Sequence, residues 1–200
     1  MKKGLKMKEE YKILNDMGYS NDKIDTLLSL GYTIKDILKI NRKTNIIATY
    51  SNKSIIDKFN YLLSLGFSKI ETISITTICP QIYCYKQDSI KTKFDNLMSL
   101  GYTYEEVKIM IINYPAILNT SLEYIKEKIE FYNSIGLHNV LIKDTSHLIT
   151  SLSLVYARYM FLKGKDVTID EKSYRKLFMR SKQFQKKYNI SSEELINKYP

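Results

Sequence analysis

The sequence repeats one short phrase at a constant interval: LLSLGYT at 27–33, LLSLGFS at 62–68, LMSLGYT at 97–103 and YNSIGLH at 132–138. The glycines of these phrases, Gly31, Gly66, Gly101 and Gly136, are each separated by 35 residues. A period of about 20–50 residues is typical of repeat proteins, in which each unit packs on its neighbours. This spacing constrains the fold more than any other feature of the chain.

The residues before each glycine form an amphipathic helical pattern. In residues 54–66 the apolar side chains have the spacing of one helical face, and this stripe recurs in the next two periods: Ile55, Phe59, Leu62 and Leu63, then Ile90, Phe94, Leu97 and Met98, then, with some drift, Ile125, Ile129 and Tyr132. Glycine readily takes a positive φ and can close the last carbonyl groups of a helix. The repeated phrase therefore predicts the end of one helix.

A second helix is predicted directly after each glycine. A hydroxyl residue is followed three positions later by an acid in Thr33–Asp36, Ser68–Glu71 and Thr103–Glu106, and the same pattern occurs at Ser191–Glu194. This is a capping box, in which the hydroxyl accepts from a free backbone N–H and the acid accepts from the backbone N–H of the hydroxyl residue. The acid also interacts favourably with the helix dipole.

Prolines predict where the second helix ends. Pro80 and Pro115 are again 35 residues apart, and proline cannot continue a helix interior. In the first unit Asn45 replaces the proline, and in the fourth unit His147 stands at its place. The residues after each break leave room for a short third helical turn, and no strand-like alternation is long enough to compete.

These patterns predict an all-α superhelical solenoid of ~35-residue helix–helix–short-helix repeats. We expect capping helices over residues 1–30, repeats over 31–165 with periods starting near the four glycines, and a basic helical cap over 166–200. The stretch from 166 onward has lost the repeated phrase.

The composition favours a polyanionic partner. Lys and Arg number 31 against 21 Asp and Glu, a formal net charge of +10, and residues 158–200 alone carry 11 basic and 5 acidic side chains. Such a balance favours binding to nucleic acid or to an anionic membrane surface.

Several other classes of protein are disfavoured by the sequence. No apolar run approaches the ~20 residues of a membrane span, and the first residues contain no signal-peptide core. Cys79 and Cys84 lack the further ligands of a zinc site, so we expect reduced thiols, no metal and no cofactor. No P-loop, HExxH or G-x-S-x-G motif occurs, so we expect no enzyme. We interpret the chain as a cytoplasmic monomer, an organellar location remaining open.

The pattern resembles the mTERF family, the mitochondrial transcription termination factors and their plant and bacterial-type relatives. The likeness is carried by IKTKFDNLMSLGYTYEEVKIMIINYPAILNTSLEYIKEKIEFYNSIGL at 90–137 and by LITSLSLVYARYMFL at 148–162. The resemblance implies a non-catalytic solenoid that binds double-stranded DNA or RNA along a basic groove and acts in transcription or RNA metabolism. The short chain and the lack of a transit peptide favour a non-imported or bacterial-type relative.

The resemblance also implies which residues bind nucleic acid. The basic residue in the family's first helix maps to Lys58, Lys93, Lys128 and, when Ser151 is aligned with Ser121, Arg158. We expect these side chains at the margin of the apolar stripe. The C-terminal cluster adds further candidates: Lys163, Lys165, Lys172, Arg175, Lys176, Arg180, Lys182, Lys186 and Lys187. Aromatic residues between them could stack on bases or pack the cap.

Two other functions remain open from the sequence alone. A protein-binding helical array of tetratricopeptide or HEAT type would also suit a period of 35 and a glycine turn. A pentatricopeptide-like RNA reader has units of the same length but lacks the Pro-Ile-Leu-type turn seen at 80–83 and 115–118.

Overall fold

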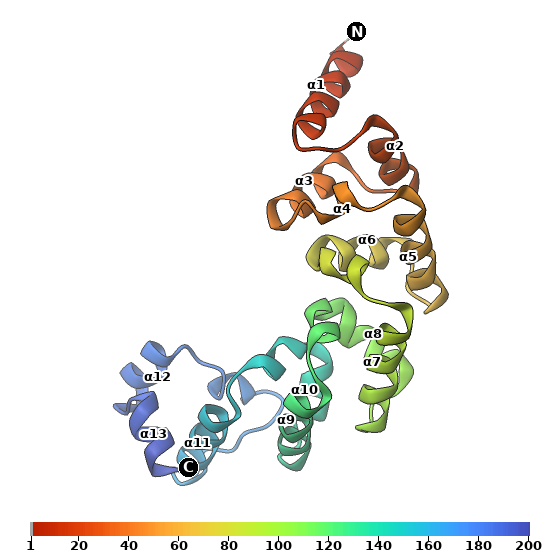
Figure 1. The fold of residues 1–200 in the computed structure, drawn as a ribbon. Coiled ribbons are helices and arrows are strands. Elements are labelled where there is room, and N and C mark those ends of the chain that lie inside the picture. Colours follow the sequence, from red (N-terminus) through yellow and green to blue (C-terminus); the bar gives the residue numbers. More distant parts are fainter. Residues whose placement is uncertain (1) are drawn as a thin grey trace. The chain divides into compact units, whose positions relative to one another are not determined.

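A computed structural model describes the backbone of residues 2–200 and the side chains of residues 8–200. The chain divides into two compact units, Met1–Lys93 and Phe94–Pro200. Every regular element among residues 2–200 is an α-helix or a 3-10 helix, and none is a strand (Figure 1). The prediction of an all-α helical-repeat protein of the solenoid type is therefore confirmed.

The first unit begins with α1 (Lys2–Asp16) and continues with two helix–helix–short-helix triplets. The first triplet is α2 (Asn21–Leu30), α3 (Ile34–Lys43) and α4 (Ile46–Thr49), and the second is α5 (Asn52–Ser64), α6 (Lys69–Ile78) and the 3-10 helix η1 (Pro80–Cys84). Equivalent helices of these triplets pack together, α2 with α5 and α3 with α6.

The second unit continues the same plan. Helix α7 (Gln87–Ser99) crosses the boundary and is followed by α8 (Tyr104–Asn113) and η2 (Pro115–Asn119), then by α9 (Leu122–Ser134), α10 (His138–Lys143) and η3 (Thr145–Ile149). The last elements are α11 (Leu152–Lys163), η4 (Tyr174–Lys176), α12 (Ser181–Tyr188) and α13 (Ser192–Lys198). Helix α8 packs on α10, and α11 packs on α13.

The repeated glycines end helices, as predicted. Gly31, Gly66, Gly101 and Gly136 have φ values of 101°, 75°, 97° and 74°, which is the left-handed region that glycine tolerates best. The backbone N–H of Gly31 donates to the carbonyls of Leu27 and Leu28, so the turn satisfies the end of α2. The residue after each glycine is buried: Tyr32, Phe67, Tyr102 and Leu137.

All four predicted capping boxes are present. At the start of α8, Thr103 Oγ1 accepts from the backbone N–H of Glu106, and Glu106 Oε2 accepts in return from the backbone N–H of Thr103 at 2.8 Å. These bonds to its charged form lower the pKa of Glu106. Each second helix therefore begins at the residue that the sequence indicates.

The short third helices are also confirmed, with one correction. Pro80 and Pro115 occupy the first positions of η1 and η2, where the missing N–H costs nothing. In the fourth unit the equivalent first position of η3 is held by Thr145 rather than by His147. The third helix of this unit begins five residues closer to its glycine, at Thr145 after Gly136 rather than as Pro115 follows Gly101, and this deletion explains the error.

The apolar stripes face the core, with one exception. Ile55, Phe59 and Leu62 are buried, and so are their equivalents Ile90, Phe94 and Leu97. Met98, predicted to belong to the second stripe, is 42% exposed. It lies at the edge of the helical face, where an unbranched and flexible side chain can extend into solvent.

Candidate nucleic-acid interface

Three of the basic residues predicted to contact phosphate are buried. The exposed fractions are 7% for Lys58, 4% for Lys128 and 1% for Arg158. Long basic side chains usually keep the charged end in water. Here the charged ends lie inside the protein and bind the main chain.

Lys58 and Lys128 make the same contact in their respective triplets. Lys58, on α5, donates from Nζ to the carbonyl of Tyr85, the residue that ends η1. Lys128, on α9, donates from Nζ to the carbonyl of Leu148 in η3 at 2.8 Å. In each case the cation links the first helix of a triplet to the carbonyl end of its third helix, where a positive charge is favourable. Burial lowers the pKa of Lys58.

A third lysine makes this contact and was missed in the sequence. Lys23, on α2, is 7% exposed and donates to the carbonyls of Ile47, at 3.4 Å, and of Tyr50, which follows α4. It lies 35 residues before Lys58, so the period alone could have identified it.

Arg158 extends the arrangement into the last part of the chain. Its Nη1 donates to the carbonyls of Leu177, at 2.9 Å, and Met179, at 2.7 Å, and its guanidinium lies 4.7 Å from the ring centre of Phe184. Burial lowers the pKa of Arg158. The segment after η4 is therefore held to α11 in the way that a third helix is held in the regular repeats.

These contacts correct the expected interface. Lys58, Lys128 and Arg158 cannot present their charge to phosphate without leaving carbonyl groups unpaired inside the protein, which costs about 1–3 kcal/mol for each buried group. These three residues therefore belong to the internal packing of the protein and not to the candidate interface. Lys93, at the equivalent position of α7, is half-buried.

The C-terminal basic cluster is accessible. Of its nine members only Lys176 is half-buried, and the other eight are exposed: Lys163, Lys165, Lys172, Arg175, Arg180, Lys182, Lys186 and Lys187. On α12 the buried Phe184 faces the protein. Lys182 and Lys186, one helical turn apart, project from the opposite side of that helix because successive residues rotate by about 100°.

Part of the cluster lines a hollow between α10 and η4. The hollow has a volume of about 250 Å³, and three cations line it: Lys143, Lys172 and Arg175. The one carboxylate in the lining, Glu171, accepts a hydrogen bond from Asn139 Nδ2 at 2.8 Å. The hollow therefore carries an excess of positive charge. Lys143 was missed in the sequence, because only the packing of η4 near α10 brings it to Lys172 and Arg175.

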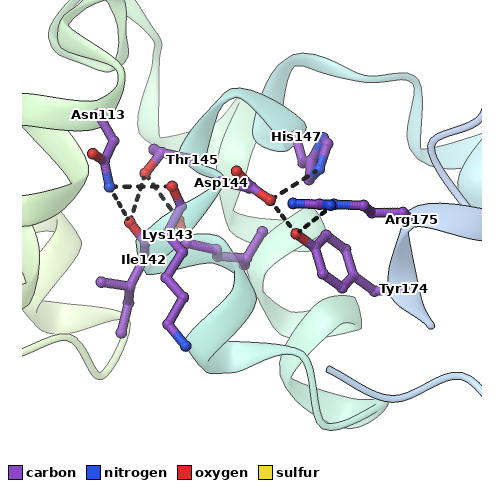
Figure 2. Close-up of polar contacts among 9 residues, drawn as sticks. Asn113, Ile142, Lys143, Asp144, Thr145, His147, Tyr174 and Arg175 are labelled. Carbon is purple, nitrogen blue, oxygen red and sulfur yellow. Dashed lines mark hydrogen bonds and ion pairs between the residues drawn. The ribbon is translucent and has the colours of Figure 1, made fainter. Parts of the chain in front are cut away.

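A polar network fixes one wall of this hollow (Figure 2). The Tyr174 hydroxyl donates to Asp144, which raises the pKa of Tyr174, and Arg175 Nε donates to the same hydroxyl oxygen at 3.3 Å. His147 Nε2 lies 3.9 Å from Asp144 Oδ2. Burial lowers the pKa of His147, the Asp144 carboxylate opposes that shift and Arg175 adds to it.

The neighbouring backbone is also fixed, because Asn113 Nδ2 on α8 donates to the carbonyls of Ile142, at 2.9 Å, and Lys143, at 3.1 Å (Figure 2). These bonds satisfy the carbonyl end of α10, at which Lys143 is the last helical residue. The backbone of Lys143, a residue that lines the hollow, is thereby held in place.

The aromatic residues of the cluster pack the protein rather than forming an exposed stacking surface. Tyr174 and Phe184 are buried, and Phe178 stacks on the His147 ring with 3.6 Å between ring centres. Tyr188 is half-buried against Phe184, with ring centres 4.6 Å apart.

Neither a metal site nor a membrane-spanning helix occurs in the part of the chain that the structure describes. No group of three or more His, Cys, Asp or Glu side chains among these residues could hold a metal ion. No helix among them is both long enough and apolar enough to cross a membrane.

The chain matches a known protein family. The sequence model of the mTERF family matches residues 7–185, which is most of the 200-residue chain. No curated protein matches the chain significantly.

Proposed function

The chain belongs to the mTERF family, and from this membership we propose that it is a non-catalytic helical-repeat protein that binds double-stranded nucleic acid, DNA or RNA. The contact surface is the C-terminal basic cluster together with Lys143. Through this binding the protein influences transcription or RNA metabolism.

The observation that carries the proposal is the basic hollow between α10 and η4. Lys143, Lys172 and Arg175 converge on a space of about 250 Å³ whose lining includes a single carboxylate. Arginine can bind phosphate oxygens with two parallel N–H bonds, and lysine acts there as a mobile point charge. Lys182 and Lys186 supply further charge for neighbouring phosphates.

Duplexes are favoured over single strands by the state of the aromatic residues. Single-strand binding proteins combine a basic groove with exposed aromatic rings on which bases stack. Tyr174 and Phe184 are buried in this protein. Phosphate contacts, which any duplex offers, therefore suit the surface better than base stacking does.

We also propose that residues 1–30 and 166–200 cap the repeats of residues 31–165. Contacts of α2 with α5, across the first boundary, and of α11 with α13, across the second, support this division. Terminal units with a polar outer face are a general requirement of repeat arrays.

The proposal is tested by measuring fluorescence anisotropy of labelled duplex DNA, duplex RNA and single-stranded DNA with the full chain over a salt series. Each neutralised phosphate on duplex DNA contributes about −0.9 to the slope of log K against log salt, so five contacts give about −4.5. We expect a duplex to bind best, with a slope of about −4 or steeper. A slope near −1 on every probe would leave only non-specific attraction and would favour the protein-binding alternative.

A further inference from the structure

A groove in the first unit is distinct from the basic cluster. It runs between α3 and α6, has a volume of about 590 Å³, and its two walls differ in chemistry. The α6 wall carries Ile70, Ile73 and Ile78. The α3 wall carries three basic residues and one acid: Lys39, Arg42, Lys43 and Asp36. Sites of about 300–1,000 Å³ that combine apolar lining with a few polar groups are typical of ligand and peptide binding.

The apolar wall is unusually open to solvent. Ile70 is 81% exposed and Ile78 is 48% exposed. With Ile73 they are spaced along two turns of α6, a length of about 12 Å at 1.5 Å per residue. Single exposed apolar residues are common, but a row of them along one groove marks an interaction site.

For two of these isoleucines, Ile70 and Ile78, the repeat shows that an apolar residue is not required at the position. The residues 35 positions before and after each are polar: Lys35 and Glu105 for Ile70, and Lys43 and Asn113 for Ile78. Glu105 is itself exposed on α8, which is the helix equivalent to α6. A polar residue is therefore compatible with the fold at the position of Ile70, and packing does not explain the isoleucine.

The basic wall offers charge as well as rigidity. Lys43 Nζ donates to the carbonyls of Thr77, at 3.1 Å, and Ile78, at 2.6 Å, and so fixes α3 against α6. Arg42 is exposed and forms no hydrogen bond or ion pair with the residues that the structure describes. The Lys39 side chain is 62% exposed, and its ammonium group lies 3.8 Å from Asp36 Oδ1, which makes a weak surface ion pair.

We propose that this groove binds an amphipathic helix of an acidic partner protein. The apolar face of that helix covers Ile70, Ile73 and Ile78, and its acidic residues pair with Arg42 and Lys39. In helix-in-groove recognition the bound helix carries its apolar anchors on one face, at i, i+3 or i+4 and i+7, and the row of isoleucines along α6 offers that face an apolar wall. The proposal adds a protein partner to the proposed nucleic-acid function and does not depend on it.

Two other occupants fit less well. A nucleic acid would place charged phosphates against the isoleucine wall, where they would lose water without gaining a partner. A second copy of this chain would bring a further net charge of +10 to a groove that is already basic on one side.

The experiment is a selection of 16-residue random peptides displayed on phage against the immobilised full chain, with counter-selection against Ile70→Ser. Selected peptides are then synthesised, and their affinities are measured by fluorescence anisotropy. Each groove variant has a matched control of the same change at an exposed site of the same unit outside the groove: Ile70→Ser against Ile56→Ser, and Arg42→Glu against Lys53→Glu. Circular dichroism melts confirm that all four variants fold.

We expect a family of peptides with acidic residues and apolar residues at helical spacing. Their affinity should fall at least about tenfold, which is 1.4 kcal/mol, with Ile70→Ser and with Arg42→Glu, and less than about twofold with the controls. Failure to select any peptide that distinguishes Ile70→Ser from the parent would overturn the proposal. So would loss of duplex binding with Arg42→Glu in the absence of such peptides, or a dimer in light scattering that Ile70→Ser dissociates.

Discussion

Replacing Lys128 by methionine tests whether the repeated basic residue is structural. Methionine keeps most of the apolar stem and removes the ammonium group, which is 2.8 Å from the Leu148 carbonyl and 3.6 Å from the ring centre of Tyr124. The unpaired carbonyl costs about 1–3 kcal/mol. The lost contact with the ring adds about 0.5–1 kcal/mol. Lys128 is only 4% exposed, so methionine also removes the cost of burying a charge, and this gain offsets part of the loss. We therefore expect the free energy of unfolding to fall by about 2 kcal/mol.

The measurement is thermal and urea unfolding followed by circular dichroism. A loss of about 2 kcal/mol lowers the midpoint by about 4–8 °C in a chain of this length. Lys126→Met is the control on the same helix, because the Lys126 side chain is 56% exposed and makes only a weak ion pair with Glu130, at 4.0 Å. This substitution should change the free energy of unfolding by less than about 0.5 kcal/mol. Equal midpoints for parent and Lys128→Met, with weaker duplex binding and a flatter salt slope, would refute the structural role and restore Lys128 to the interface.

Three further predictions follow from the local geometry. Gly101→Ala should lower the free energy of unfolding by about 1 kcal/mol, because alanine is strained at a φ of 97°, although its added methyl group would meet no neighbour. Gly164→Ala, at a φ of −68°, should leave the free energy of unfolding unchanged. Equal urea midpoints for the two variants would contradict this prediction. Thr103→Ala should cost about 1 kcal/mol by removing the α8 cap, which amide hydrogen exchange in that first turn can check. Burial lowers the pKa of His147, so as the pH falls the unfolded chain takes up a proton at this residue before the folded chain does. The contribution of neutral His147 to stability is therefore complete above about pH 6.5 and is lost as the pH falls through the lower pKa of the folded state. His147→Gln should reduce that acid sensitivity in pH-dependent melts and His138→Gln should not.

The helix ends and helix starts could be predicted because they depend on residues close together in the sequence. Gly31 and its equivalents need a positive φ, and the capping boxes close within three residues, so both can be identified without tertiary structure. The position of Thr145 at the start of η3 was missed because a deletion displaced the alignment.

The candidate interface could be predicted only in part. A helical wheel places Lys58 beside the apolar stripe, but it does not show that the carbonyl end of η1 lies within reach of its ammonium group. Lys143 joins Lys172 and Arg175 through packing between elements about 30 residues apart in sequence, which no local pattern encodes. The accessible C-terminal lysines were identified from charge density alone, since nothing in that stretch requires them to be buried.

The most direct test of the nucleic-acid proposal compares two double variants on one duplex DNA over a salt series. Lys172→Ala with Arg175→Ala removes two cations from the basic hollow, whereas Lys12→Ala with Lys53→Ala removes two exposed cations from the first unit. We predict that the hollow pair flattens the slope of log K against log salt by about 2 and weakens binding on every sequence, while the control pair leaves the slope nearly unchanged. Equal losses in the two pairs would show that binding reflects net charge alone and would contradict the assignment of the interface.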